Sequence, residues 1–388
     1  MSINGKAYIA GAFEHPTRKA LDKSVAQLHA ECALGALKDA GLTKDDVDGY
    51  FCAGDAPGLG PINLADYMGL KLRHVDSTET GGSSYLVHVA HAAEAIALGK
   101  CSVALITLAG RPKAEGMATG TKPRVYGDSP DVPFELPFAP VITNMYGMCA
   151  MRHMYEFGTT SEQLAWIKVA ASHHAQHNPN AVLQDVVTVE DVVNSPLISD
   201  PLHRLDCCVI SDGGGALVVV SPEIAKTLNR PLVKIKGAGE SPKGQMGGRV
   251  DLTYSGAAVS GPNAFAEAGV KPSDIKYASI YDSFTITVLM QLEDLGFCEK
   301  GEGGKFVSDG NLISGVGKLP FNTDGGGLCN NHPANRGGMT KVIEAVRQLR
   351  GEAHPAVQVP NCDLVLAHGT GGSLGTRHGS ATLILERE

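Results

Sequence analysis

Between residues 76 and 110, apolar positions follow a pattern that predicts a turn, a buried helix and a buried strand in succession. Gly81 and Gly82 suit a sharp turn, and either of the two serines that follow can cap a helix ending near Gly99. Few charges interrupt the apolar positions, so we expect this helix to be mostly buried. The run SVALITLA is apolar and β-branched, as in a covered parallel strand. Because the N–H groups at the start of a helix that follows a strand can bind ligands, we expect the functional site at the amino end of this helix.

Weaker periodicity outlines the rest of the first half. We expect a strand at KAYIAGAF, helices over residues 21–40 and 62–71, and another buried strand at SDGGGALVVVS. Residues 111–205 contain more proline, histidine and methionine, and we interpret them as an insertion suited to substrate selection. Within that insertion, TTSEQL predicts the capped start of a helix over residues 160–177.

The second half of the chain repeats the first. AFAEAGVKPSDIKYASIYDSF has the same order of helix end, glycine, acidic turn and strand as ALKDAGLTKDDVDGYFCAGD, and NCDLVLAHGTGG resembles KCSVALITLAG. Two such matches predict a duplicated α/β fold with halves at residues 1–222 and 223–388, and chance similarity is the alternative. The residues that match at identical spacing are Gly41, Leu42, Asp46 and Val47 with Gly269, Val270, Asp274 and Ile275.

Composition narrows the class of protein. The 388 residues carry a net charge of −8 without a Lys/Arg run, which argues against nucleic acid or an anionic membrane as partner. No apolar run approaches the length of a membrane span, and the first residues lack the pattern of a signal peptide. Nine cysteines without a CxxC pair predict reduced thiols, a cytoplasmic location and no cysteine-type zinc site. Without GxGxxG or GxxxxGK[ST], we expect no nucleotide chemistry of the usual kinds.

Three polar segments stand out against this apolar frame. GGGLCNNHPANRGG places His332 between glycines, where an imidazole can transfer protons, although it could also be a turn residue. The glycines of AHGTGGSLGTRHGSATLIL could present N–H donors to an oxyanion or simply form a tight hairpin. YDSF, residues 281–284, offers a phenol, a carboxylate and a hydroxyl at a strand end.

Two further histidine groups are weaker candidates. His88, His91 and Glu94 share a helical face that could bind metal, but a packed, hydrogen-bonded histidine pair is the better interpretation, and we predict no metal site. The second group is expected to form a solvated helix face and consists of His173, His174 and His177.

The order of PLHRLDCCVISDGGGALVVVS, YDSF, GGGLCNNHPANRGG and AHGTGGSLGTRHGSATLILERE resembles the thiolase superfamily over essentially the whole chain. It is most similar to the sterol-carrier-protein-type thiolases and their bacterial lipid-transfer-protein homologues. The resemblance implies a duplicated, five-layered α/β/α/β/α fold and a tight homodimer. It also implies an acyl-CoA substrate, partly bound by the insertion, with coenzyme A as the substrate carrier and no tightly bound cofactor.

The resemblance assigns roles to individual residues. The family's GHP histidine, which activates the nucleophile or helps to form an oxyanion hole, matches His332. Tyr281 and Asp282 stand where the family has an asparagine–glutamate or histidine–aspartate pair. His368 falls on the cysteine of the carboxyl-terminal CxGGG motif and would keep a proton-transfer group there. The glycines of that motif are retained as Gly371 and Gly372.

The nucleophile is where this sequence departs from the family. In the family, a cysteine stands at the start of the helix that is predicted here to end near Gly99. At that position this sequence has Gly82, or Ser83 with a shift of one residue. A serine is a poor nucleophile without a dedicated base, and Cys329 is a conceivable substitute.

Retro-aldol cleavage of a 3-hydroxyacyl-CoA needs no acyl-enzyme, and aldolases among the lipid-transfer-protein homologues work with a small zinc-ribbon and OB-fold partner. Under that hypothesis His332 and glycine N–H groups stabilise the enolate, while Tyr281, Asp282 or His368 handles the β-hydroxyl proton. The alternatives are a CoA-dependent thiolase or acyltransferase acting on a 3-oxoacyl-CoA, and a non-catalytic protein that binds acyl-CoA or lipid.

Overall fold

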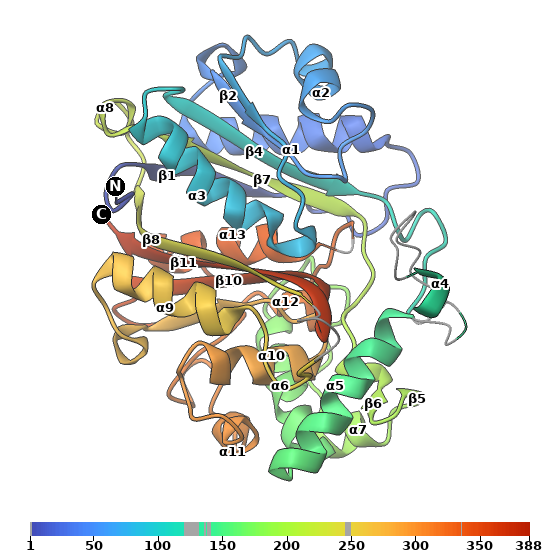
Figure 1. Cartoon of the computed structure of the whole chain (residues 1–388). Coiled ribbons are helices and arrows are strands. Elements are labelled where there is room, and N and C mark those ends of the chain that lie inside the picture. Colours follow the sequence, from blue (N-terminus) through green and yellow to red (C-terminus); the bar gives the residue numbers. More distant parts are fainter. Residues whose placement is uncertain (1, 120–131, 136, 138–140, 245–249, 335) are drawn as a thin grey trace.

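One nine-stranded mixed sheet runs through the computed structural model, which describes residues 2–119, 132–135, 137, 141–244, 250–334 and 336–388 (Figure 1). The strands follow the spatial order β3-β2-β4-β7-β1-β8-β11-β10-β9. Their bounds are β1 Tyr8–Glu14, β2 Gly49–Phe51, β3 His74–Asp76, β4 Val103–Gly110, β7 Gly213–Val220, β8 Val233–Lys243, β9 Tyr277–Ile280, β10 Leu364–Ser373 and β11 Thr376–Arg387.

The strand order confirms the duplication predicted from the sequence. In the first half β2 is parallel to β4, which is antiparallel to β7, which is antiparallel to β1. In the second half β9 is parallel to β10, which is antiparallel to β11, which is antiparallel to β8. An antiparallel contact between β1 and β8 joins the two series. The run SVALITLA, predicted as a parallel strand, therefore has one parallel and one antiparallel neighbour.

Helices complete five layers, as the predicted fold requires (Figure 1). α1 (Val25–Ala40) packs on β1, β4 and β7, and α9 (Ala257–Ala268) occupies the equivalent place on β8 and β11. Between the two sheet halves lie α3 (Ser84–Ala97) and α13 (Gly338–Arg350), each of which contacts strands of both halves. The helix that the sequence predicts before Gly99 is α3, and it lies in the central layer of the fold.

The repeated turns have the same backbone. Gly41 and Gly269 end α1 and α9 in the left-handed region, at φ of 72° and 67°, where glycine is favoured. A short 3₁₀ helix follows each glycine, Lys44–Asp46 in the first half and Pro272–Asp274 in the second. In each, the aspartate accepts a backbone hydrogen bond from the residue before the helix, so the sequence match reflects a shared local structure.

The remaining elements form the lower part of the molecule and the connections (Figure 1). Residues 120–131, 136 and 138–140 of the predicted insertion lie outside the described residues. The elements described in and after the insertion are α4 Val132–Glu135, α5 Ile142–Phe157, α6 Ser161–Ala175, α7 Val189–Val193, β5 Leu197–Ser199 and β6 Leu202–His203. The other helices are α2 Pro61–Met68, α8 Pro222–Ala225, α10 Thr285–Asp294, α11 Gly303–Val307 and α12 Gly326–Cys329.

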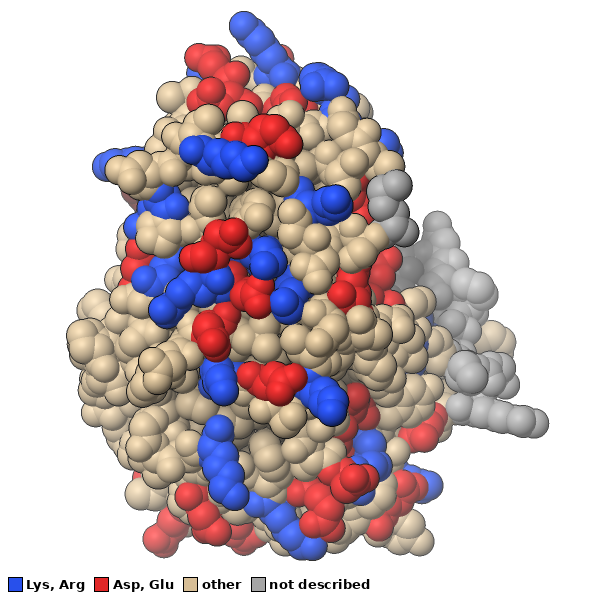
Figure 2. Space-filling model, turned by 90° about the vertical axis from the view of Figure 1, so that its left-hand side faces the viewer, with Lys and Arg blue, Asp and Glu red and all other residues tan. Residues whose placement is uncertain are grey.

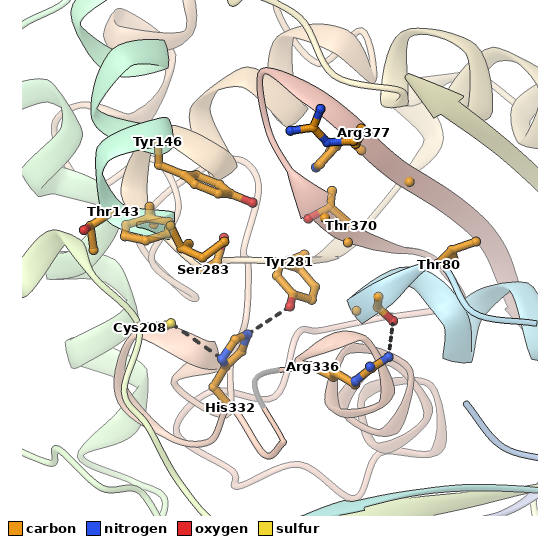
Figure 3. A pocket seen from close by; sticks show the side chains of 18 of the residues that line it. Thr80, Thr143, Tyr146, Cys208, Tyr281, Ser283, His332, Arg336, Thr370 and Arg377 are labelled. Atoms are coloured by element: carbon orange, nitrogen blue, oxygen red, sulfur yellow. Dashed lines mark hydrogen bonds between the residues drawn. The ribbon is translucent and has the colours of Figure 1, made fainter. Parts of the chain in front are cut away.

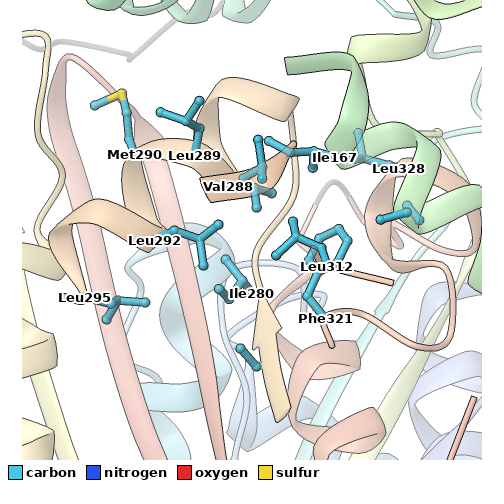
Figure 4. Packing of buried hydrophobic residues seen from close by; sticks show 14 of the residues in the cluster. Ile167, Ile280, Val288, Leu289, Met290, Leu292, Leu295, Leu312, Phe321 and Leu328 are labelled. Carbon is cyan, nitrogen blue, oxygen red and sulfur yellow. The ribbon is translucent and has the colours of Figure 1, made fainter. Parts of the chain in front are cut away.

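A hydrophobic cluster packs β9, α10 and α6 against one another (Figure 4). Ile280 ends β9, and Leu289 and Leu292 on α10 are fully buried in the same cluster as Ile167 of α6 and Phe321. Because YDSF connects β9 directly to α10, this packing determines where its side chains lie.

Helix starts differ from the prediction in two places. α1 begins only at Val25, where Ser24 accepts a hydrogen bond from the Gln27 N–H and caps the helix. α3 begins at Ser84 after a 3₁₀ turn, and neither serine caps it as expected. Ser83 Oγ donates to the Thr80 carbonyl, and Ser84 Oγ accepts from the Thr80 N–H.

The predicted solvated histidine face was wrong, because His174 is buried and its Nε2 accepts a hydrogen bond from the Ser314 N–H at 2.9 Å. On α3, His88 is buried and His91 pairs with Asp76 at 2.7 Å. Among the described residues, no group of three or more His, Cys, Asp or Glu could hold a metal.

Basic and acidic side chains are interspersed on the face that carries both chain termini (Figure 2). Among the ion pairs of the molecule, Lys234 and Lys236 on β8 both contact Glu386 on β11. Within the described part of the chain, no helix is long and apolar enough to cross a membrane.

Candidate active site

A cavity of about 910 Å³ opens where the amino end of α3, the β10–β11 hairpin and the start of α5 meet. Five of the residues to which the resemblance assigns a catalytic or binding role line it: Gly82, Tyr281, His332, Gly371 and Gly372. The elements that meet there belong to both halves and to the predicted insertion, so the site depends on the complete fold.

His332 lies at the base of the cavity in the loop between α12 and α13 (Figure 3). Its Nε2 is 3.0 Å from the phenol oxygen of Tyr281, and its Nδ1 is 3.6 Å from Sγ of Cys208. Its backbone N–H donates to Ser211 Oγ at 2.9 Å. Contacts on both ring nitrogens and on the backbone leave the imidazole one orientation, with the Tyr281 phenol between it and Gly82.

The Tyr281 phenol lies against Gly82, one of the two positions at which the family resemblance places the missing nucleophile. A Cβ atom at Gly82 would overlap the Tyr281 ring and hydroxyl as well as the Thr370 carbonyl. Glycine is therefore the residue that fits at this position before the helix, and the phenol oxygen fills the space that a side chain at Gly82 would need. The Gly337 N–H donates to the same oxygen at 3.2 Å, which favours negative charge on it.

Burial keeps this pair uncharged. It lowers the pKa of His332 to about 4, against the opposing effect of Asp282. It also raises the pKa of the Tyr281 phenol, although the Gly337 N–H acts in the opposite direction. A neutral imidazole beside a neutral phenol at pH 7 is a competent proton acceptor–donor pair.

Asp282, the neighbour of Tyr281, is turned away from the cavity. Its Oδ1 accepts hydrogen bonds from Lys341 Nζ and the Gly327 N–H, both at 2.8 Å, and its Oδ2 accepts from the Leu328 N–H at 3.1 Å. The carboxylate and the ammonium are both buried. Asp282 thus anchors the amino end of α12, the short helix that leads to His332, and does not line the cavity.

His368 and Ser83 are also outside the cavity lining. His368 is fully buried on β10, its Nδ1 lies 2.8 Å from Thr382 Oγ1, and burial lowers its pKa to about 3. Ser83 is committed to Thr80 through its hydroxyl. From these two segments, residues 80–82 and 370–372 line the cavity.

Cys329 does not substitute for the nucleophile. It is fully buried, and its Sγ accepts a hydrogen bond from Lys168 Nζ at 3.1 Å. The same ammonium donates to the Leu328 carbonyl at 2.7 Å. Lys168 thus holds α12 through two contacts, one of them to Cys329, which agrees with a packing role for this cysteine.

Gly371 and Gly372 bring the β10–β11 hairpin against the turn before α3. A side chain at Gly371 would overlap the Thr80 carbonyl and the Gly82 nitrogen, and Gly372 has a φ of 85°. This close approach forms the wall of the cavity nearest to Tyr281. It requires glycine for reasons of space and backbone conformation.

The sequence did not single out several residues of the site. Cys208 lies in the segment DCCVISDGGG, which was noted for its resemblance but not for the thiol. Arg336, in the loop after His332, pairs with Glu79 through Nη1 at 2.6 and 2.8 Å at the cavity wall (Figure 3). Tyr146 of α5 and Phe284 pack with ring centroids 4.4 Å apart and provide an apolar surface. These residues lie on segments that are far apart in the sequence, so their contacts can be recognised only in the folded structure.

A buried polar network holds the His332 loop from the first half. Ser211 Oγ donates to Asn331 Oδ1 at 2.7 Å, and Asn331 Nδ2 donates to Glu14 at 3.0 Å. Glu14 also pairs with Arg347 of α13 at 2.9 Å, and its pKa is lowered to about 2, because Arg347 and Arg18 outweigh the opposing effect of burial. These contacts fix the loop that carries the imidazole to the strand β1.

Comparison with known proteins gives this site a context. Residues 238–387 match the family model described as "Thiolase C-terminal domain-like". The chain is 38% identical to the steroid side-chain-cleaving aldolase of Thermomonospora curvata, over 90% of this chain and 91% of that protein. It is 34% identical to an acetyl-CoA acetyltransferase of Methanothermobacter thermautotrophicus, over 92% and 93%. A solved structure of an Ltp2–ChsH2(DUF35) aldolase is 36% identical with a TM-score of 0.87, covering 99% and 98%.

Proposed function

This chain belongs to the thiolase superfamily, and we propose that it is an aldolase that cleaves the Cα–Cβ bond of a 3-hydroxyacyl-CoA. One observation carries the proposal: the Tyr281 phenol, 3.0 Å from His332 Nε2, fills the space above Gly82 in which a nucleophilic side chain would have to lie. Acyl transfer through cysteine needs that nucleophile, whereas retro-aldol cleavage needs a proton acceptor and stabilisation of an enolate.

The pair supplies the proton acceptor. The phenol oxygen takes the proton of the β-hydroxyl as its own proton passes to Nε2 of His332. The β-oxygen becomes a carbonyl, the Cα–Cβ bond breaks, and its electrons form the thioester enolate. The returning proton then reaches Cα, so that a shortened acyl-CoA and an aldehyde or ketone leave without any other reactant. Nε2 of His332 can accept the proton only if the ring hydrogen is on Nδ1. That Nδ1–H can donate a hydrogen bond to Cys208 Sγ, which lies 3.6 Å away.

Negative charge in the transition state falls near positive backbone dipoles. The phenol oxygen lies at the amino end of α3 and accepts the Gly337 N–H. The glycine wall of Gly371 and Gly372 allows the thioester to approach the backbone closely. Under this mechanism Asp282 and His368 act through the structure and not on the β-hydroxyl proton.

Other features of the proposal rest on the family and the relatives. Coenzyme A acts as substrate carrier and is not a tightly bound cofactor. The family resemblance leads us to propose a small zinc-ribbon and OB-fold partner together with a homodimer. A solved aldolase structure similar to this chain, in which Ltp2 is combined with ChsH2(DUF35), supports the existence of a partner. All nine cysteines are free, which supports the proposed cytoplasmic location.

The test is a product analysis with matched substrates. The purified protein, with and without a co-purifying small subunit, is given a 3-hydroxyacyl-CoA alone and a 3-oxoacyl-CoA with free CoA. We expect carbonyl release from the hydroxy substrate without CoA. Tyr281→Phe should lower kcat by a factor on the order of 10² to 10³. The matched control is Tyr155→Phe, which makes the same change on the exposed face of α5.

A second candidate is CoA-dependent thiolysis, which is favoured by the thiol of Cys208 beside His332 and by the acetyltransferase among the relatives. CoA-dependent shortening of the oxo substrate that is lost in Cys208→Ala would establish it and exclude the aldolase. Binding of acyl-CoA without turnover of either substrate, with the partner present, would leave only a binding protein.

A further inference from the structure

The hydroxyl of Thr370 has no hydrogen-bond partner among the described residues although its side chain is completely buried. It lies on β10 at the wall of the cavity, next to Tyr281 (Figure 3). A buried hydroxyl without a partner is unfavourable by more than the net gain of an ordinary hydrogen bond, so it calls for an explanation.

Some neighbouring hydroxyls on the same hairpin and on the loop after β9 have partners. Thr382 Oγ1 on β11 contacts both His368 and Ser260, and Ser283 Oγ contacts Thr287. Unpartnered hydroxyls also occur on Ser279, Thr376 and Ser380, but none of these three residues lines the cavity. Thr370 therefore combines burial, an unpartnered hydroxyl and a place in the wall of the cavity.

Its position relative to Tyr281 identifies the substrate atom. The Thr370 carbonyl and the Tyr281 hydroxyl both lie against Gly82. The side chain of Thr370 lies beside that of Tyr281 in the same wall of the cavity (Figure 3). In the proposed reaction that corner holds the β-oxygen, because Tyr281 removes its proton.

We propose that Thr370 binds the β-oxygen of the 3-hydroxyacyl group and so selects hydroxylated over non-hydroxylated acyl-CoA. This inference rests on the proposed function. The Thr370 hydroxyl donates to the β-oxygen while the proton of that oxygen passes to Tyr281, and it keeps the hydrogen bond as the oxygen becomes a carbonyl. A site that pairs a buried hydroxyl with the substrate discriminates against analogues that leave it unpaired.

The experiment measures binding, not turnover. Affinities for 3-hydroxydecanoyl-CoA and decanoyl-CoA are measured by titration calorimetry, with Tyr281→Phe as the background that prevents cleavage. Adding Thr370→Val, which keeps the shape and removes the hydroxyl, should weaken binding of the hydroxylated ligand about tenfold. Binding of decanoyl-CoA should change by less than about twofold, and Thr370→Ser should restore the preference.

An equal loss for both ligands, or no loss for either, would overturn the assignment. A thermal unfolding midpoint within a few degrees of the background excludes misfolding as the cause of a loss. Absence of turnover by the wild-type protein would reject the aldolase but would not change this comparison, so the two failures are distinguishable. With Tyr281 intact, Thr370→Val should lower kcat/KM for the hydroxylated substrate, and Thr370→Ser should recover most of it.

Discussion

The ring of Tyr281 and the α-carbon of Gly82 are packed so closely that no side chain fits between them. A glycine at the amino end of α3 and a tyrosine after β9 are therefore one structural unit, although about 200 residues separate them in the sequence.

Restoring the family cysteine by Gly82→Cys should not create a thiolase. The new side chain would displace the Tyr281 ring, so we expect aldol cleavage to fall by a factor of about 10² and no CoA-dependent thiolysis to appear. Product analysis with both substrates checks this. Gly82→Ala is the control, and should lose cleavage to a similar extent because the overlap begins at Cβ. Thiolysis by Gly82→Cys would contradict the assignment of the space to Tyr281.

Asp282→Asn should destabilise the protein. The substitution leaves the Lys341 ammonium buried without its counter-charge, which typically costs about 3–5 kcal/mol. Urea unfolding followed by circular dichroism measures the loss. The double variant Asp282→Asn with Lys341→Met should recover part of it, because the unpaired charge is removed. An unchanged unfolding midpoint together with a large loss of kcat would show that Asp282 acts in the chemistry.

Stability should decrease as the pH falls from about 6.5 towards 4. Burial lowers the pKa of His88 and His174 to about 4, so the unfolded chain, whose histidines titrate near 6.5, binds more protons over this interval. Each histidine contributes up to about 1.4 kcal/mol per pH unit. Denaturant titrations at several pH values should give a shallower slope for His88→Gln than for the wild type.

His91 should make the protein less stable as the pH rises, the opposite of the effect of His88 and His174. Its hydrogen bond to Asp76 and that to Glu240 raise its pKa to about 10, so its stabilising contribution is complete below about 6.5 and is lost as the pH rises towards 10. Its ring is partly exposed, which reduces the size of the effect. In the same titrations His91→Gln should flatten the curve above pH 7 and leave the slope between pH 4 and 6 unchanged.

Alkylation should inactivate the protein slowly and through Cys208. Cys208 is a partly exposed residue of the cavity lining, and burial raises the pKa of its thiol, so little thiolate is present at pH 7. Acyl-CoA should protect it from iodoacetamide, as peptide mass mapping can measure. Cys298 is the other partly exposed cysteine and serves as an internal control, since it lies outside the cavity lining. Rapid inactivation that Cys208→Ala does not prevent would contradict this prediction.

The sequence predicted the helices, strands and turns better than it predicted which side chains line the cavity. The periodicity of α3, the repeated turns at Gly41 and Gly269, and the glycine-flanked His332 are local signals, and the structure agrees with them. Tyr281 and Asp282 are adjacent at a strand end, and only packing decides which one enters the cavity.

The same limit applies to His368, which lies two residues before Thr370 on β10, deeper in the fold. Cys208 could not be found from spacing, because the loop that brings it to His332 has no periodic pattern.

The duplicated frame explains how such a site can diverge. The two copies share strand order and turns, yet the first contributes a bare backbone at Gly82 and the second contributes the phenol and the imidazole. Because these groups lie on loops and strand ends, substitutions there can change the chemistry while the packing of the central layers is kept. A symmetric frame can therefore carry an asymmetric catalytic site.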